Sequence, residues 1–233
     1  MSVLPVIPTM VGTPTDLATM DYADAYSHDT TFMHNTLIRA FNQIGAKAMK
    51  IPPPEITDFA TYVDAFCETL RRHCEGENTI IFPRISAHTF LNGEDNAALL
   101  SCLERVEQWV RDTAQLPEKA DPTELVAAME VMAPLFSKNM HEQPRHMSPS
   151  VLRSALSGPE LRDLVNTDIA WVAQNSRMEY LLPFLVLHHD ISTNEAWPGL
   201  PEMAKKALPE LAAVNLGCWK YAPFTLSEQL RPL

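Results

Sequence analysis

An imidazole and a carboxylate lie four residues apart in a stretch of the sequence with helical periodicity. His73 and Glu77 share a helical face with the apolar residues Phe59, Leu70 and Ile80. Because an unpaired charge in an apolar core is costly, each needs a partner such as a metal ion, another polar side chain or a ligand. Such a pair can transfer a proton or bind a metal. The spacing alone leaves a structural hydrogen bond equally open.

A third candidate stands in an earlier helical stretch. His34 shares its face with Leu37 and Phe41, so it points toward the same interior as His73 and Glu77. We therefore expect His34, His73 and Glu77 to converge from two adjacent helices and to form the catalytic set.

The elements that must position these residues are helices. Apolar residues recur three and four apart through most of the sequence, whereas alternating β-branched runs bounded by turn residues do not occur. The fold class is therefore expected to be all-α. Four helices are predicted, over 21–44, over 57–82 up to Pro83, over 94–115, and from Pro122 to a stop at Pro144. Their short links favour an antiparallel four-helix bundle.

Three regions are expected along the chain. They are an irregular N-terminal segment (1–20), the four-helix bundle (21–147) and a helical C-terminal extension packed on the bundle (148–233). In the last region, helical segments over 151–156, 159–174 and 200–216 alternate with proline-rich joints.

Composition narrows the class of partner. The 233-residue chain has a formal net charge of -11 that is spread through the sequence, and it has no basic block that could neutralise phosphates. We therefore expect neither nucleic acid nor a membrane as a partner. The four cysteines lack a metal-binding spacing, which favours free thiols in a reducing compartment. No signal peptide is recognised, and the longest apolar run, 181–187, is too short to span a bilayer. These features predict a cytoplasmic protein.

Several segments resemble one known family. In 70–83 a His-x-x-x-Glu pattern precedes Phe-Pro, which is similar to the second helix of hemerythrin-like proteins, and Met33-His34-Asn35 resembles the first-helix histidine of that family. The segments 182–184 and 217–224 resemble its long fungal branch. The resemblance covers nearly the whole chain and implies a hemerythrin-like four-helix bundle.

The family binds two irons with histidines and carboxylates from all four helices, and this sequence departs from that set. The inward positions of the third helix are Asn96 and Leu100, and those of the fourth are Asn139 and Gln143. Leucine cannot bind iron, and amides are poor iron ligands. His141 is expected on the wrong side of the fourth helix, as a solvated residue near its end. We therefore expect no bound metal and no cofactor, with far less than one equivalent of iron per chain.

The remaining histidines carry less weight. His188 and His189 precede Asp190 after an apolar run, and because adjacent residues face different ways, a helix-end or turn role is favoured over a ligand cluster. His28 points away from the face of His34 and is expected at the surface.

A few polar side chains inside an otherwise apolar bundle are typical of a small-molecule site. The leading hypothesis is a metal-independent enzyme that binds an apolar substrate and catalyses isomerisation, dehydration or cyclisation, including pericyclic ring closure. The catalytic residues would be His34, His73 and Glu77, and the substrate would contact Tyr62, Phe66, Asn96, Leu100, Asn139 and Gln143. The resemblance to the fungal branch suggests secondary metabolism. Two alternatives stay open: a non-enzymatic carrier or interaction protein, and a protein that retains one iron on the three catalytic candidates for oxygen chemistry.

Overall fold

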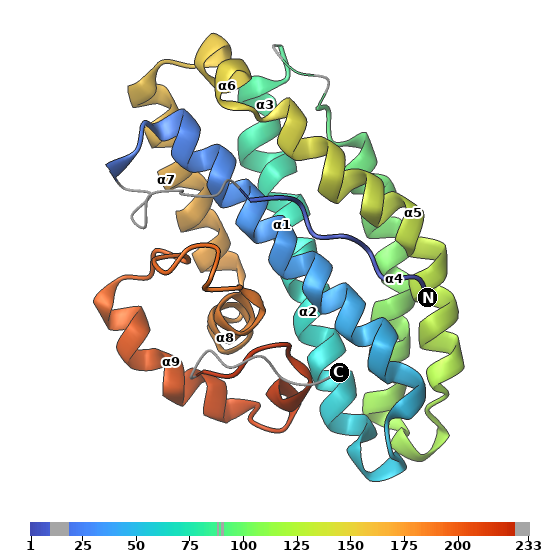
Figure 1. Cartoon of the computed structure of the whole chain (residues 1–233). Coiled ribbons are helices and arrows are strands. Elements are labelled where there is room, and N and C mark those ends of the chain that lie inside the picture. Colours follow the sequence, from blue (N-terminus) through green and yellow to red (C-terminus); the bar gives the residue numbers. More distant parts are fainter. Residues whose placement is uncertain (10–18, 88, 90, 227–233) are drawn as a thin grey trace.

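The chain is almost entirely helical where its structure is described. The structure is a computed structural model, and it describes residues 1–9, 19–87, 89 and 91–226 (Figure 1). Within these residues every regular element is a helix or a helical turn and no strand is present, so the all-α prediction is confirmed. None of the described helices has both the length and the apolar character needed to span a membrane.

Four long helices surround the main core. They are α1 (Tyr22–Lys47), α2 (Ile56–Gly76), α4 (Glu94–Gln115) and α5 (Pro122–His146). The helix α1 packs on α2, α2 on α4, α4 on α5, and α5 on α1, and helices that follow one another run in opposite directions (Figure 1). Short helical turns connect or flank them: η2 (Ala48–Lys50), η3 (Pro53–Glu55) and η5 (Pro117–Lys119).

The starts of two of these helices follow from local chemistry. Asp21 accepts a hydrogen bond from the backbone N–H of Ala23 at 3.0 Å and caps α1. Asp121 caps α5 in the same way, accepting from the N–H of Thr123 at 2.8 Å, and proline occupies the next position, where its missing N–H does no harm.

Two proline stops predicted from the sequence are wrong. The helix α5 continues through Pro144 to His146, because the burial of neighbouring Met140 and Gln143 outweighs the cost of roughly 3 kcal/mol for an interior proline. After α2 the chain does not stop at Pro83. It passes through a π-helical turn, η4 (Glu77–Ile81), into the short helix α3 (Phe82–Ile85), where Pro83 lies in the first turn and loses no hydrogen bond.

The C-terminal helices cover the face formed by α1 and α2. They are α6 (Pro149–Ala155), α7 (Gly158–Asn175), α8 (Met178–His188) and α9 (Glu202–Val214), followed by the turn η6 (Cys218–Tyr221). Both α7 and α8 contact α1 and α2, whereas α9 packs mainly on α8 (Figure 1). The sequence pattern missed α8, because a helix that is apolar on nearly all sides shows no amphipathic period.

The first nine residues run along α1 and α5 instead of projecting from the fold. Asn42 exchanges hydrogen bonds with the backbone of Leu4 at 2.8 and 2.9 Å, and Asn35 does so with Ile7 at 2.7 and 3.0 Å. Of the segment expected to be irregular (1–20), residues 10–18 lie outside the described residues.

Candidate functional site

Three side chains meet where α1 lies beside the end of α2. His34 comes from α1, His73 from the last turn of α2, and Glu77 from the first position of η4. Nε2 of His34 lies 3.0 Å from Nε2 of His73, and the same atom of His73 lies 3.4 Å from Oε1 of Glu77. All three donor atoms lie within 4.8 Å of one another, so the structure brings the predicted set together.

A backbone carbonyl fixes the tautomer of His34. Nδ1 of this fully buried ring lies 2.8 Å from the carbonyl oxygen of Met140, and a carbonyl can only accept, so Nδ1 carries the proton and Nε2 presents its lone pair to the cluster. Burial, assisted by the neighbouring His73, lowers the pKa of His34 to about 4, and burial also lowers that of His73 to about 4. Both imidazoles are therefore neutral near pH 7.

Burial shifts the pKa of the Glu77 carboxyl group in the opposite direction to those of the two histidines. Burial raises its pKa to about 7, and this shift is opposed by His34 and by hydrogen bonds from Asn96 and Gln143. Nδ2 of Asn96 donates to Oε2 of Glu77 at 2.9 Å and fixes the plane of the carboxyl. Near neutral pH this group is consequently close to the midpoint of its titration.

The buried amides on α4 and α5 form a connected network. Oδ1 of Asn96 accepts from Nδ2 of Asn139 at 2.5 Å and from Nε2 of Gln143 at 2.9 Å, and all three residues are buried. Among the residues that the structure describes, Oδ1 of Asn139 and Oε1 of Gln143 find no donor. Two buried acceptors without partners therefore lie beside the cluster, which is uncommon in folded proteins.

A π-helical turn carries Glu77, and sequence reasoning missed it. It begins directly after Gly76, where α7 comes so close that an added Cβ would lie 3.0 Å from Oδ1 of Asp168 and 3.4 Å from the ring of Trp171. Single π-helical turns inside α-helices occur frequently at functional sites. A glycine directly before the predicted carboxylate was the one local signal, and by itself it did not distinguish a π turn from a regular helix.

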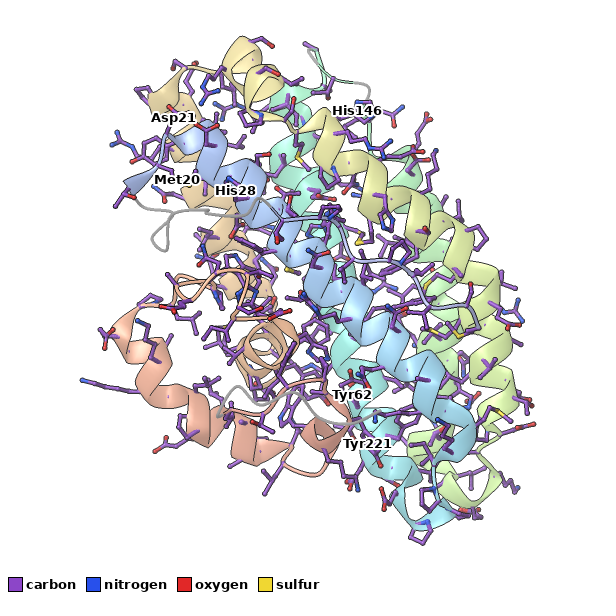
Figure 2. All side chains as sticks on the ribbon, in the orientation of Figure 1. Met20, Asp21, His28, Tyr62, His146 and Tyr221 are labelled. Carbon is purple, nitrogen blue, oxygen red and sulfur yellow. The ribbon has the colours of Figure 1, made fainter. Side chains whose placement is uncertain are left out.

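The predicted walls of a substrate pocket do not gather at the cluster. Tyr62 lies eleven positions before His73, about 16 Å along the helix axis, and its hydroxyl lies 2.7 Å from Nε2 of His188. Figure 2 shows Tyr62 beside Tyr221, and their ring centroids are 6.0 Å apart. The expectation that Tyr62 shapes the same site is wrong, because one helical face extends over several turns.

Phe66 and Leu100 also belong to the core. The ring of Phe66 packs edge-on against those of Phe41 and Phe136, with centroids 6.3 and 6.0 Å away. Leu100 is partly buried against the same core, one turn after Asn96. Of the six predicted substrate contacts, only the three amides therefore join the network around Glu77.

His141 occupies a different place from the one expected. It lies inside α5 and is partly buried, with Nδ1 2.7 Å from the carbonyl of Ser137 and Nε2 2.9 Å from the carbonyl of Pro5. The N-terminal segment covers it, so the prediction of a solvated helix-end residue is wrong. It is not among the three residues whose donor atoms converge.

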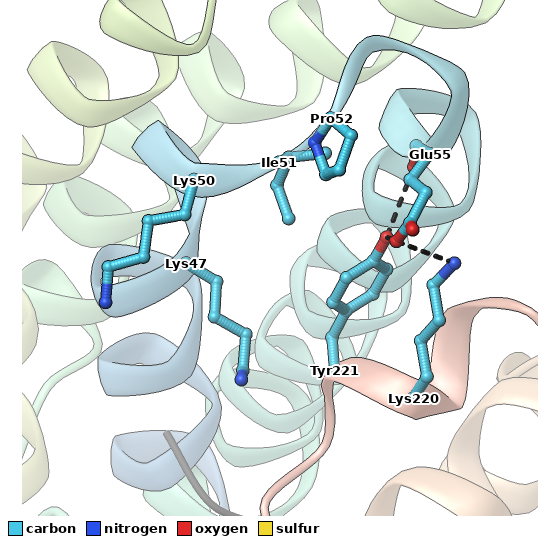
Figure 3. Close-up of a pocket in the computed structure, with 7 residues that line it drawn as sticks. All are labelled: Lys47, Lys50, Ile51, Pro52, Glu55, Lys220 and Tyr221. Atoms are coloured by element: carbon cyan, nitrogen blue, oxygen red, sulfur yellow. Dashed lines mark hydrogen bonds and ion pairs between the residues drawn. The ribbon is translucent and has the colours of Figure 1, made fainter.

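Two hollows are described on the molecule, and neither is lined by the cluster. One, of about 350 Å³, lies between the end of α1 and η6, where Lys47, Lys50 and Lys220 surround a pair formed by Tyr221 and Glu55 (Figure 3). The other, of about 230 Å³, lies beside α8 and α9. Within the cluster His34 and Glu77 are buried, and the His73 side chain is 12% exposed. Neither of these two hollows therefore forms the predicted substrate pocket around the three residues.

Gly93 lies directly before α4, close to this network, and its replacement gives a first prediction. It precedes α4 with φ 82°, and an added Cβ would lie 2.8 Å from Oδ1 of Asn78, which accepts from Asn96. Gly93→Ala is expected to lower the free energy of unfolding by about 1–2 kcal/mol or more, as measured by urea denaturation. Gly199→Ala, where the added atom meets nothing within 4 Å, is the control. Equal stability of the two variants would contradict the prediction.

Comparisons of the chain with models of protein families, with curated proteins and with solved structures find no match. Function therefore has to be inferred from the geometry of the site.

Proposed function

We propose that His34, His73 and Glu77 bind one divalent transition-metal ion as a two-histidine, one-carboxylate site. The observation that carries this proposal is the spacing of the donor atoms, 3.0 Å between the two Nε2 atoms and 3.4 Å from His73 to Glu77. Ligands bonded to one ion at about 2.1 Å lie about 3.0 Å apart at right angles and about 3.4 Å apart at tetrahedral angles. Two of the three separations therefore match donors bound to one ion, and the third pair, His34 and Glu77, lies within 4.8 Å.

The residues present fit one ion and not two. A second ion would need strong ligands from α4 and α5, but those helices supply Asn96, Leu100, Asn139 and Gln143. A single ion instead receives two neutral imidazoles and a carboxylate that loses its proton near pH 7. This favours the single-ion alternative over a metal-free site.

Each residue around the site has a defined part. The carbonyl of Met140 holds the lone pair of His34 toward the cluster, and the amide of Asn96 holds the carboxylate of Glu77 in place. When bound, an iron(II) ion in such a ligand set supplies oxygen chemistry. Because the site is closed except at the His73 edge, it favours a reactant as small as dioxygen over a large organic substrate.

The same residues support a proposal about ancestry. We infer that α1, α2, α4 and α5 are a hemerythrin-like four-helix bundle whose two-iron centre has been reduced to one site. The observation in favour is that the histidine of the first helix meets the His-x-x-x-Glu pair at the end of the second, within a set of four mutually packed helices.

Titration with Co²⁺ tests the metal site directly, and it is our second prediction. Metal-free protein is expected to bind one equivalent and to develop visible d–d absorption, since this ion reports its own coordination by imidazole and carboxylate. Isothermal titration calorimetry gives the stoichiometry independently. No absorption change at saturating Co²⁺ would refute the proposal, and two equivalents with coupled spectra would show that α4 and α5 supply ligands after all.

The third prediction is the pH dependence of this affinity. Above about pH 5 the two imidazoles are already neutral, because their pKa values are lowered to about 4, and only Glu77 must lose a proton. The affinity for Co²⁺ should therefore rise about tenfold per pH unit up to about pH 7 and then level off. In Glu77→Gln the affinity should be weaker and independent of pH over the same range. A slope of two or three protons would mean that the histidines are charged before binding.

A metal-independent acid–base site is the second candidate, and the raised pKa of Glu77, about 7, favours it. In that case Glu77 and His73 would exchange a proton with a substrate at the partly exposed edge, as an isomerisation requires. A chelator distinguishes the two candidates. If the protein binds metal, chelation should lower the melting temperature and Co²⁺ should restore it. If it does not, neither treatment should change the melting temperature.

A further inference from the structure

Two tyrosines of the core lie side by side, and the hydroxyl of each contacts a basic group. Tyr62 on α2 is fully buried, and its ring centroid lies 6.0 Å from that of Tyr221 in η6 (Figure 2). We propose that the two residues form a one-electron redox site, in which Tyr62 holds a tyrosyl radical and Tyr221 connects it to the surface. This site is separate from the proposed metal site and does not require it.

The hydrogen bond between Tyr62 and His188 has a defined direction. Nδ1 of His188 lies 2.8 Å from the carbonyl oxygen of Phe184, and a carbonyl can only accept, so Nδ1 carries the proton. The ring is fully buried, which favours its neutral form, so Nε2 carries a lone pair. The hydroxyl of Tyr62, 2.7 Å away, therefore donates to Nε2. This distance is short enough for direct proton transfer.

A base in this position determines how easily the phenol of Tyr62 is oxidised. A phenol that loses one electron becomes a strong acid, so its proton has to leave with the electron. A one-electron oxidant, such as a radical formed from peroxide, takes an electron from the ring of Tyr62, and the hydroxyl proton moves to Nε2 of His188. The O–H bond breaks and an N–H bond forms. The products are a neutral tyrosyl radical, an imidazolium ion and the reduced oxidant, and the return of one electron reverses both steps.

The surroundings of Tyr62 shelter such a radical. Tyrosyl radicals are lost when they couple with a second radical or react with a solute, and both reactions need contact with the ring. The ring of Tyr62 is fully buried among those of Phe59, His188 and Tyr221, with centroids 5.6 to 6.4 Å away. Electron transfer does not need contact, so this residue can exchange electrons while it stays protected.

Tyr221 supplies the step between Tyr62 and the surface. It lines the hollow between the end of α1 and η6, and its hydroxyl donates to Oε2 of Glu55 at 2.9 Å (Figure 3). Hydrogen bonds from Lys220 and Tyr221 lower the pKa of Glu55, so its carboxylate is ionised and can accept the proton of Tyr221. Once an oxidant in the hollow has taken an electron from Tyr221, an electron from Tyr62 replaces it. Glu55 then returns its proton, and the radical moves to Tyr62.

Flash oxidation of the full-length, metal-free protein tests this site. A photogenerated tris(bipyridine)ruthenium(III) complex supplies the oxidant from solution, and EPR spectroscopy and transient absorption follow the tyrosyl radical. The wild type is expected to form a long-lived radical that is lost in Tyr62→Phe, which keeps the ring and removes only the hydroxyl. Its high-field EPR spectrum should show a hydrogen bond from the imidazolium of His188 to the radical oxygen. Equal radical lifetimes in the two proteins, or no tyrosyl radical in the wild type, would refute the proposal.

Further variants separate the parts of the site. His188→Phe keeps an aromatic ring but removes the base, and it should slow formation of the long-lived radical about a hundredfold or more. Tyr221→Phe should slow its formation without changing its lifetime. Tyr22→Phe, at an exposed position of α1, and His73→Ala, in the proposed metal site, should leave the radical unchanged. Melting temperatures show whether each variant is folded. Unaltered formation of the radical in folded His188→Phe would contradict the role of the imidazole.

Discussion

His73→Ala is expected to weaken the binding of Co²⁺ by a hundredfold or more, and this is the largest functional effect that the structure predicts. The substitution removes one of three donors and opens the exposed edge of the site to water. Loss of a group that merely orients a metal ligand already costs about 10–100-fold in affinity, so loss of the ligand itself should cost at least the upper value. Competition with a chromophoric chelator measures the difference.

His141→Ala is the matched control for that experiment. It removes an imidazole from the neighbouring helix α5, where both ring nitrogens contact carbonyl oxygens outside the cluster. Its affinity for Co²⁺ should stay within a few-fold of the wild type. If His141→Ala weakened binding as much as His73→Ala, the ion would lie nearer α5 than proposed.

Asn96→Ala is expected to cause the largest loss of stability, about 3 kcal/mol or more in the free energy of unfolding. Its amide donates to Glu77 and accepts from Asn139 and Gln143, and its removal leaves buried polar groups on η4 and α5 without partners. Each such group costs about 1–3 kcal/mol when it is desolvated and unpaired. Urea denaturation followed by circular dichroism measures the change.

Two comparisons show whether the polar network is responsible. Asn166→Ala, at an exposed position of α7, should be neutral or slightly stabilising, because alanine has the higher helix propensity. Asn96→Leu restores most of the side-chain volume but none of the hydrogen bonds, so it should be about as unstable as Asn96→Ala. Recovery of wild-type stability in Asn96→Leu would mean that the lost volume, and not the network, accounts for the effect.

Local sequence patterns were sufficient to predict part of this structure. The apolar period predicted the all-α class, and the bounds of α4 and the start of α5 at its Asp121 cap agree with the structure. The inward positions of His34, His73 and Glu77 also follow from the helical period, because residues three and four apart share one face. The amides on α4 and α5 lie at the positions that this period assigned to them.

Tertiary contacts decided what the helical period could not. The π turn at Glu77 lies where α7 presses on Gly76, and α5 tolerates Pro144 because its neighbours are buried. Tyr62 shares a helical face with His73, yet its partner is His188, which comes from a helix 126 positions later in the chain.

The hollow beside α8 and α9 likewise exists only because these helices and the segments that follow them meet there. The sequence by itself determined which faces are apolar and which residues could do chemistry, because caps and periodicity depend on neighbours a few positions away. Only the tertiary structure decided which of those residues touch. Such contacts depend on packing between segments far apart in the chain. A local sequence pattern does not show which of those segments will meet.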